Sequence, residues 1–328
     1  MHRSPPPVCP PDACLLADMT MQRTPVTLEL MRGSPARRRK ERLVQALFGG
    51  AAMLGLVISL AIVLALIEGA ASWLLAIDLG WLWSDGWYPR RNDFDLLTIF
   101  LGTVIIAVIA MLVATPLGLG AAAYLSEYAT PRVRRTLKPV IETLASIPSV
   151  VLGYFALQWI TPNLVERFFP SAGTANLLSA GIGVGILTIP LVASVAEDAM
   201  HSVPNSLREA AFGIGARRRT VTARVVFPAA VSGIVASMIL GFSRAVGETM
   251  VVALAAGATG GAQRTINPLD PGQTMTGAIS SLAIGSDQVR GSGFAFDSLY
   301  FVGLLLFAIT LLLNILSERF VRRFRRRS

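Results

Sequence analysis

Long apolar stretches separated by short polar segments make up most of this chain from residue 43 onwards. Six stretches contain no charged residue: 43–67, 96–126, 143–165, 171–196, 225–243 and 298–317. A membrane-spanning helix needs about 20 mostly apolar residues, because each residue adds about 1.5 Å across a hydrocarbon core about 30 Å thick. We therefore predict an all-α polytopic membrane protein with six spans, in which helices satisfy their own backbone hydrogen bonds. We expect the fifth span to continue past Arg244 towards Ala256.

The first 42 residues differ from this pattern. Prolines recur at positions 5–7, 10, 11, 25 and 35, where they break helices, and no apolar stretch typical of a signal peptide precedes residue 43. We predict a disordered, proline- and arginine-rich cytoplasmic arm over 1–42, a transmembrane domain over 43–323 and a basic cytoplasmic tail over 324–328. Cys9 and Cys14 lack the histidine or cysteine spacing of a metal site, so we expect reduced, inert thiols and no bound metal.

The positions of the basic residues predict the orientation in the membrane. Of 29 lysines and arginines, 23 lie in residues 1–42, 127–142, 197–224 and the tail after residue 317. The alternate loops, 68–95, 166–170 and 257–297, hold only five. The positive-inside rule therefore places both termini and the loops 127–142 and 197–224 in the cytoplasm. This topology and anionic lipid headgroups explain the net charge of +9, so we expect no nucleic-acid partner.

The loop around residues 202–228 contains a short predicted helix. Ser206 and Glu209 fit the capping-box spacing, in which Ser206 caps the helix and Glu209 reaches back to its N-terminus. Gly215 suits the left-handed position that ends a helix. A second helix then leads back to the membrane at Pro228. The apolar residues of the first helix recur at the spacing of a single face: Leu207, Ala210, Ala211 and Ile214.

An ordered helix in a cytoplasmic loop predicts a surface on which another protein docks. The alternative is an interfacial helix lying on lipid, but the apolar face is short and rich in alanine, which gives weak lipid binding. The chain also lacks an ATP site. A P-loop needs a lysine after a glycine-rich turn, and neither Lys40 nor Lys138 follows a glycine. We therefore expect a transport subunit rather than an enzyme, with ATP and Mg²⁺ bound by a separate subunit.

The spacing of this loop resembles the EAA loop of ABC importer permeases. Glu209-Ala210-Ala211 is followed after three residues by Gly215, and after nine more by Val225-Val226-Phe227-Pro228. Val225 and Phe227 replace the usual isoleucine and leucine and stay apolar. In that family the loop seats the permease on its ATPase. The resemblance implies a coupling surface formed by Ser206, Leu207, Glu209, Ala210, Ala211, Ile214, Gly215 and Pro228.

A second candidate site lies in the fifth predicted span, where Arg244 and Glu248 are one helical turn apart. An arginine at mid-membrane costs about 2.5–3.5 kcal/mol, and pairing with a carboxylate lowers that cost. In one interpretation the two residues neutralise each other and lock the helix bundle. In the other, Arg244 presents its guanidinium to an anionic solute while Glu248 holds it in place. A guanidinium suits tetrahedral oxyanions because it donates parallel N–H bonds to two oxygens.

Four segments resemble the permease subunits of phosphate ABC importers of the PstC type: 116–127, 146–153, 194–199 and 244–249. The resemblance implies a type I importer permease fold with six spans in the bacterial inner membrane. It implies phosphate transport by alternating access, with Arg244, Glu248 and Thr249 along the substrate path. The partners would be a companion PstA-like permease, a pair of PstB-like ATPase subunits and an extracytoplasmic PstS-like phosphate-binding protein.

Two other transport classes remain open. A sulfate or molybdate ABC permease would share the loop but should lack the block at 244–249. An ion-coupled secondary transporter would have inverted repeats and a mid-membrane ion site. Away from these sites, we expect Gly181, Gly183 and Gly185 to permit close helix packing. We expect Glu197 and Asp198 to pair with nearby arginines such as Arg208, and the tryptophans near residues 73–87 to form an interfacial belt.

Overall fold

The part of the chain described by the computed structural model is almost entirely helical. It comprises residues 35–257, 261–284 and 293–325. Four helices are long and apolar enough to cross a membrane, and the number rises to six when each of two bent helix pairs is counted as one span. The predicted all-α polytopic membrane protein is therefore confirmed.

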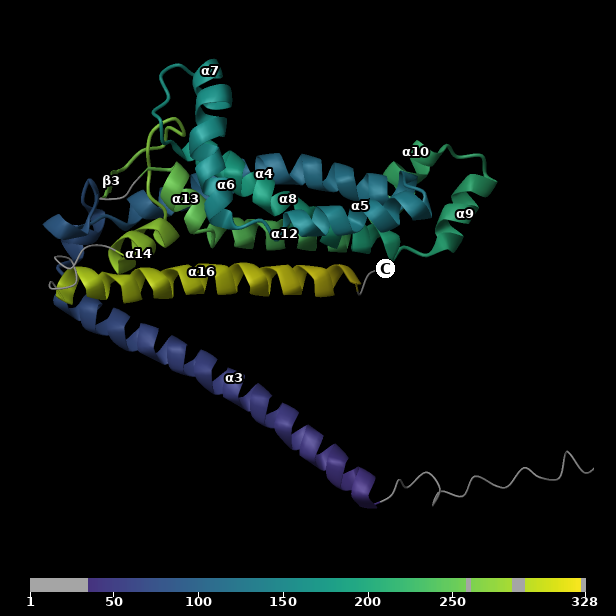
Figure 1. Ribbon diagram of the computed structural model, residues 1–328, viewed down its shortest axis with the longest axis horizontal. Helices are drawn as coiled ribbons and strands as arrows, with labels where there is room; N and C mark the ends of the chain where they lie inside the picture. Colours follow the sequence, from purple (N-terminus) through teal and green to yellow (C-terminus); the bar gives the residue numbers. More distant parts are fainter. Residues whose placement is uncertain (1–34, 258–260, 285–292, 326–328) are drawn as a thin grey trace, which may run out of the picture. The chain divides into compact units, whose positions relative to one another are not determined.

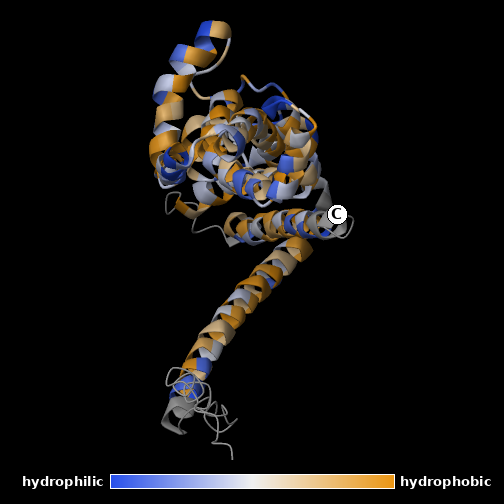
Figure 2. Ribbon diagram, turned by 90° about the vertical axis from the view of Figure 1, so that its right-hand side faces the viewer, coloured by the Kyte–Doolittle hydropathy of each residue, from blue (hydrophilic) through white to orange (hydrophobic). Residues whose placement is uncertain are grey.

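The N-terminal helix, α3 (Pro35–Ala76), begins earlier than predicted. Its first eight residues, 35–42, belong to the range predicted to be a disordered arm, and they are helical in the structure. A proline is well tolerated at the first helical position, because its missing N–H would have no partner there. Hydrophobic residues cover most of α3 (Figure 2). The chain divides into two compact units after Ile62. Residues 1–34 of the predicted arm, with Cys9 and Cys14, and residues 326–328 of the tail lie outside the described residues.

The second unit is a helix bundle in which α8 (Leu177–His201) packs against α4 (Leu96–Ala123) and α12 (Val231–Val246), and α12 packs in turn against α16 (Gly293–Arg325) (Figure 1). Glycines of α8 let α4 approach closely, as predicted. A Cβ atom added at Gly181 would lie 2.7 Å from Ile109, and one at Gly185 would lie 2.8 Å from Val113. Either distance is too short for a real contact, so a side chain at these positions would separate the two helices.

The third predicted span is broken. Helix α5 (Pro131–Leu144) is followed at Ser149 by α6 (Ser149–Phe155), which continues through η4 (Ala156–Val165) into α7 (Glu166–Phe168). The axis bends by 81° at this break. Pro148 explains the position, because a proline disfavours helical geometry at the residue before it. The helix that the sequence placed at 143–165 therefore starts at Ser149, and α5 is an additional element.

The fifth predicted span is also interrupted. Helices α10 (Arg218–Val221) and α11 (Phe227–Ala229), joined by η5 (Thr222–Val226), lead into α12 with a bend of 72°. Helix α12 ends at Val246, and α13 (Met250–Ala255) begins after three further residues. The chain therefore stays largely helical past Arg244 as far as Ala255, as expected, but as two helices rather than one, because the helical hydrogen bonding of α12 ends at Gly247.

A small antiparallel sheet lies at the end of the bundle opposite α9 and α10 (Figure 1). Its strand order is β2 (Asp93–Phe94), β1 (Gly86–Tyr88), β3 (Ala262–Gln263), and Trp87 pairs with both Phe94 and Ala262. Trp73 and Trp87 are buried, with ring centroids 5.2 Å and 5.7 Å from that of Phe94. These two tryptophans belong to a core cluster rather than to an interfacial belt. The remaining elements here are η1 (Leu79–Trp83), η2 (Pro89–Arg91) and α14 (Met275–Ile284).

Candidate functional site

The predicted loop helix is present as α9 (Asn205–Gly213), but its N-terminus is not the predicted capping box. Pro204 occupies the cap position in an extended conformation, and its carbonyl accepts a hydrogen bond from the Leu207 amide at 3.2 Å. No side chain caps this end. Ser206 lies inside the first turn, and Glu209 is exposed. The capping role assigned to these two residues is therefore wrong, because the proline already starts the helix before Ser206.

The C-terminus of α9 agrees with the prediction. Gly215 has a positive φ of 83°, the left-handed conformation that glycine adopts without steric cost. Its amide donates to the Phe212 carbonyl at 2.9 Å, and the Ala216 amide donates to the Ala211 carbonyl at 3.1 Å. These two bonds form the Schellman motif, which satisfies carbonyls that a helix end otherwise leaves free.

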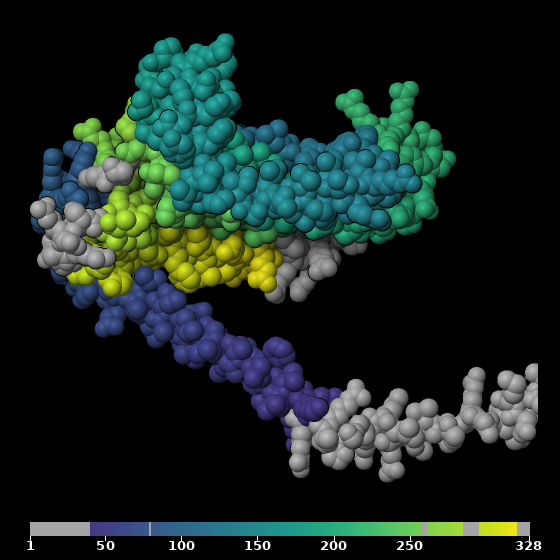
Figure 3. Space-filling view, viewed as in Figure 1, coloured from purple at the N-terminus to yellow at the C-terminus, as the bar shows by residue number. Residues whose placement is uncertain are grey.

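The apolar face of α9 is divided between the protein interior and its surface. Ala211 is buried in a cluster with Met200 and Val203 at the end of α8. Leu207, Ala210 and Ile214 are exposed, Ile214 to 87%. Phe212, which the sequence argument did not include, is exposed as well. Together with α10, this helix forms the surface at one end of the second unit (Figure 3). Pro228 of α11 is also exposed.

Arg208 ties α9 to the ends of two long helices. Its Nη2 donates to Glu127 Oε1 at 2.9 Å and to the Met200 carbonyl at 2.8 Å. Its Nη1 contacts Asn205 Oδ1 at 3.2 Å and the Val203 carbonyl. Glu127 lies in η3 (Tyr124–Tyr128), which directly continues α4. The two side chains are 14% and 6% exposed.

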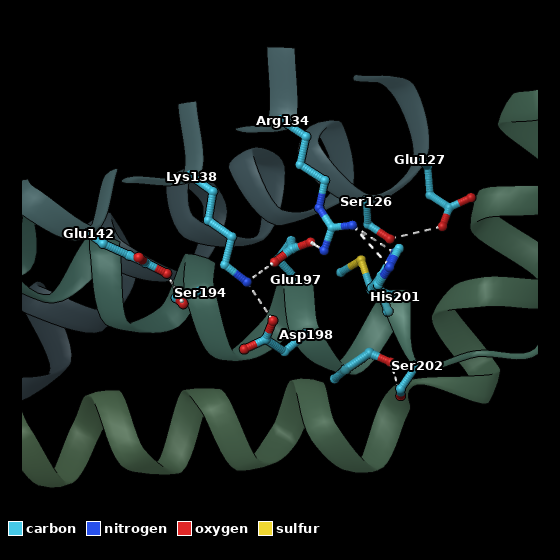
Figure 4. A network of polar contacts seen from close by, with 12 residues as sticks. Ser126, Glu127, Arg134, Lys138, Glu142, Ser194, Glu197, Asp198, His201 and Ser202 are labelled. Atoms are coloured by element: carbon cyan, nitrogen blue, oxygen red, sulfur yellow. Dashed lines mark hydrogen bonds and ion pairs between the residues drawn. The ribbon is translucent and has the colours of Figure 1, made fainter. Parts of the chain in front are cut away.

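Glu197 and Asp198 pair with basic residues of α5. The expected pairing with a nearby arginine is found for Glu197, but the arginine is Arg134 and not Arg208. Lys138 Nζ lies 2.7 Å from Glu197 Oε2 and 2.6 Å from Asp198 Oδ1. Arg134 forms a further ion pair with Glu197 and lies 2.9 Å from a ring nitrogen of His201. Figure 4 shows these side chains of α5 reaching across to α8. The network fixes α5 on α8.

Arg244 lies in the last turn of α12. Across residues 35–257, 261–284 and 293–325 its guanidinium forms no hydrogen bond or ion pair, and the residue is exposed. It opens onto a pocket of about 430 Å³, which is lined by Leu191, Leu240, Ser243, Arg244, Gly247 and Glu248. Thr249, the third predicted path residue, does not line this pocket.

Glu248 does not pair with Arg244, and the expected interaction across one helical turn is wrong. The helix ends before this pair forms: the Gly247 amide already bonds to the carbonyls of Ser243 and Arg244. Glu248 Oε1 instead accepts hydrogen bonds from the amides of Met250 at 3.2 Å and Val251 at 3.4 Å. A carboxylate is favourable there, because the first amides of a helix lack partners within the helix.

The break between α12 and α13 is held in place from a third element. The Thr276 hydroxyl of α14 donates to the Glu248 carbonyl at 2.7 Å. The Thr249 hydroxyl donates to the Gly247 carbonyl at 3.4 Å. These contacts fix Glu248 on α13 and leave the guanidinium of Arg244 and the hydroxyl of Ser243 as donors in the pocket. Such a site can bind an oxyanion. No group of three or more metal-ligating side chains occurs within the described ranges.

Comparisons with known proteins agree with this architecture. The family described as "Binding-protein-dependent transport system inner membrane component" matches residues 114–328. The chain is 33% identical to "Phosphate transport system permease protein PstC" of Mesorhizobium japonicum over 299 residues, which cover 84% of this chain and 89% of the relative. It is 32% identical to "Probable ABC transporter permease protein YqgH" of Bacillus subtilis, with coverages of 67% and 75%.

One solved structure shows the same fold at low sequence identity. A bacterial ABC transporter involved in the import of the acidic polysaccharide alginate aligns with a TM-score of 0.51 and 15% identity. The alignment covers 86% of this chain and 99% of that chain. The predicted ABC importer permease fold is thus confirmed. With a family match over residues 114–328 and a relative that aligns along most of its length, this chain belongs to the inner membrane components of binding-protein-dependent transport systems.

Proposed function

We propose that this chain is the transmembrane permease subunit of an ATP-driven phosphate importer. In this role it moves inorganic phosphate from an extracytoplasmic binding protein into the cytoplasm by alternating access. The similarity to relatives named as phosphate permeases supports the proposal. The single observation of the structure that supports it best is the unpaired guanidinium of Arg244 in an open pocket.

A cation without a counter-charge is unfavourable within a membrane and marks the path of an anion when it faces a cavity. The guanidinium of Arg244 would hold two oxygens of phosphate, and the hydroxyl of Ser243 would donate a further hydrogen bond. Glu248 would act indirectly. Because its carboxylate binds the amides of α13, it leaves the charge of Arg244 available to the anion. Thr249 would fix the break beside the path rather than contact the ligand.

Helix α9 would couple this subunit to ATP hydrolysis. Its exposed side chains, Leu207, Ala210 and Ile214, with Glu209 beside them, would contact an ATPase subunit in the cytoplasm. Gly215 and Pro228 would set the turns that present this surface. The assembly would contain a companion PstA-like permease, a pair of PstB-like ATPase subunits that bind ATP and Mg²⁺, and a PstS-like phosphate-binding protein. Both termini of this chain would lie in the cytoplasm.

Uptake of labelled phosphate tests this proposal. Cells without phosphate importers of their own would express the chain with its partner subunits, and sulfate and molybdate would be added as competitors. We expect ATP-dependent phosphate uptake that requires this chain and is insensitive to sulfate. Arg244→Ala should lower it about 10- to 100-fold, because the charge-assisted contact to the anion is lost. Arg167→Ala removes an exposed arginine away from the pocket and should not change uptake. Uptake of sulfate or molybdate in place of phosphate would contradict the substrate assignment.

A further inference from the structure

The polar contacts of Arg208 join three segments that are far apart in the sequence. One guanidinium reaches Glu127 beyond α4, two carbonyls at the end of α8, and Asn205 within α9. Glu127 is 81 residues away from Arg208. The carbonyls of Met200 and Val203 lie where a helix end leaves acceptors free, and a cation there is electrostatically favourable. Every acceptor that surrounds this guanidinium therefore belongs to the junction between the long helices and α9.

Apolar packing contributes little to the attachment of α9. Ala211 is the one buried residue of this helix, and its side chain is a single methyl group. A methyl group buries little area, so it orients the helix weakly. A second polar contact supports the first: the guanidinium of Arg218 in α10 lies 5.3 Å from the ring centre of Tyr128 in η3. The polar attachment of α9 and α10 to η3 thus consists of two arginines that bind neighbouring residues of that segment, while Val221 and Val226 of the same loop pack in the apolar cluster that includes Ala122 of α4.

One of the two long helices that Arg208 contacts, α8, also forms a wall of the candidate transport site. Leu191 of α8 lines the pocket of Arg244. One turn of α12 packs directly on α8, because a Cβ atom at Gly241 would lie 2.8 Å from Val192. A rigid helix transmits displacement along its length, and no flexible linker interrupts α8 between Leu191 and Met200. Arg208 therefore connects α9 to the helix that borders the pocket.

From this geometry we infer that Arg208 and Glu127 are positioning residues that transmit the movement of α9 to α4 and α8. The inference rests on the proposed function, in which α9 binds the ATPase. The pair touches neither phosphate nor ATP. Its buried charges give the junction one preferred geometry, because either charge left alone there would lack compensation. Without the pair, α9 could move with the ATPase without displacing α4 and α8.

A double-mutant cycle in the complete transporter tests the inference. Glu127→Gln, Arg208→Gln and the double variant would be purified with the partner subunits and reconstituted in vesicles with the phosphate-binding protein. Glutamine keeps hydrogen-bonding capacity at both positions while removing the charge. Three quantities would be measured: assembly with the ATPase subunits, the rate of ATP hydrolysis, and phosphate imported per ATP hydrolysed. Arg224→Gln, an exposed arginine of the same loop region, is the matched control.

We expect each single variant to assemble and hydrolyse ATP while phosphate imported per ATP falls by about fivefold or more, a change in the range of measured coupling effects. The double variant should be no worse than either single variant, since both remove one interaction. Unchanged coupling in the single variants, additive losses in the double variant, or lost assembly of Glu127→Gln would each overturn the inference. A wild-type complex that hydrolyses ATP without importing phosphate would instead contradict the proposed function.

Discussion

Arg208 and Arg244 have the same side chain and lie near helix ends in one domain, yet their surroundings are opposite. Arg208 is 14% exposed and binds a carboxylate, an amide oxygen and two carbonyls. Arg244 is exposed to a pocket and binds no residue of the described chain. A guanidinium whose donors are used within the fold holds the fold together. A guanidinium whose donors remain free is available to a ligand. The roles of the two arginines therefore differ because of the groups that surround each side chain, not because of the residue type.

The difference arises from backbone geometry at each site. Around Arg208, the end of α8 turns into α9 and presents carbonyls, while η3 brings Glu127 alongside. Around Arg244, the helix stops at Val246 and carries the nearest carboxylate onto α13. A continuous helix would have placed Glu248 one turn from Arg244 and neutralised it. The helix break therefore prevents an ion pair between the two side chains, although both line the pocket.

The largest effect on stability is expected from Arg208→Ala. Glu127 is buried, and removing the partially buried Arg208 leaves this carboxylate without compensation, which costs up to about 3–5 kcal/mol. We expect the melting temperature of the purified subunit in detergent to fall clearly, as measured by a thermal unfolding assay. The same change at Arg244 should leave it almost unaltered, because that side chain has no partner to lose. An equal fall in both variants would remove the distinction between the two arginines.

The next effect is on transport. Arg244→Ala removes a charge-assisted contact of about 1.5–3 kcal/mol to the anion and should lower phosphate uptake about 10- to 100-fold. Arg244→Lys should retain part of the activity, because an ammonium keeps the charge but not the planar pair of donors. Initial rates of labelled phosphate uptake, corrected for the amount of protein in the membrane, measure both. Normal uptake by Arg244→Ala would show that the pocket does not bind the substrate.

A smaller effect is expected from Glu248→Ala. The loss of hydrogen bonds to the first amides of α13 should cost about 1 kcal/mol, as for other helix caps. Glu248→Gln keeps an acceptor oxygen and should be milder. Thermal unfolding of the two variants beside Arg244→Ala distinguishes a cap from an ion pair. If Glu248 paired with Arg244, the two alanine variants would lose similar stability and their losses would not add.

The smallest effect is expected from Ser243→Ala. A neutral hydrogen bond to the ligand contributes about 0.5–1.5 kcal/mol, so phosphate uptake at low concentration should fall by about tenfold at most. Uptake measured over a range of phosphate concentrations would show this as weaker apparent affinity. A larger loss than in Arg244→Ala would mean that the hydroxyl, rather than the guanidinium, dominates binding in this pocket.

Local features of the fold could be predicted from the sequence. Uncharged stretches located the spans, and Gly215 located the end of the loop helix, because apolar length and a left-handed turn depend on neighbouring residues alone. The residues at which helices begin were harder to predict, because several local sequence signals compete there. The spacing of Ser206 and Glu209 suggested a cap, but Pro204 starts the helix earlier. Pro148 likewise divides what composition alone presents as one span.

The partners of the charged residues could not be predicted in this way. Glu127 and Arg208 are 81 residues apart, and no local pattern indicates that the ends of α4 and α8 meet. Lys138 and Glu197 are 59 residues apart and meet only because α5 folds back on α8. For Arg244 and Glu248 the spacing was correct for a pair, but glycine is frequent in membrane helices, so Gly247 did not reveal the break. In each of these cases the tertiary structure, and not the local sequence, determines which charged residues meet.

The contacts between α5 and α8 also restrict how these two helices can slide. Three successive turns of α5 place Arg134, Lys138 and Glu142 opposite His201, the Glu197–Asp198 pair and Ser194. A slip of one turn, about 5.4 Å, in one direction would put Glu142 against two carboxylates. A slip in the other direction would leave Lys138 facing a serine. These contacts therefore favour a single register between α5 and α8. The two helices can move together or separate, but they cannot slide along each other without losing the contacts.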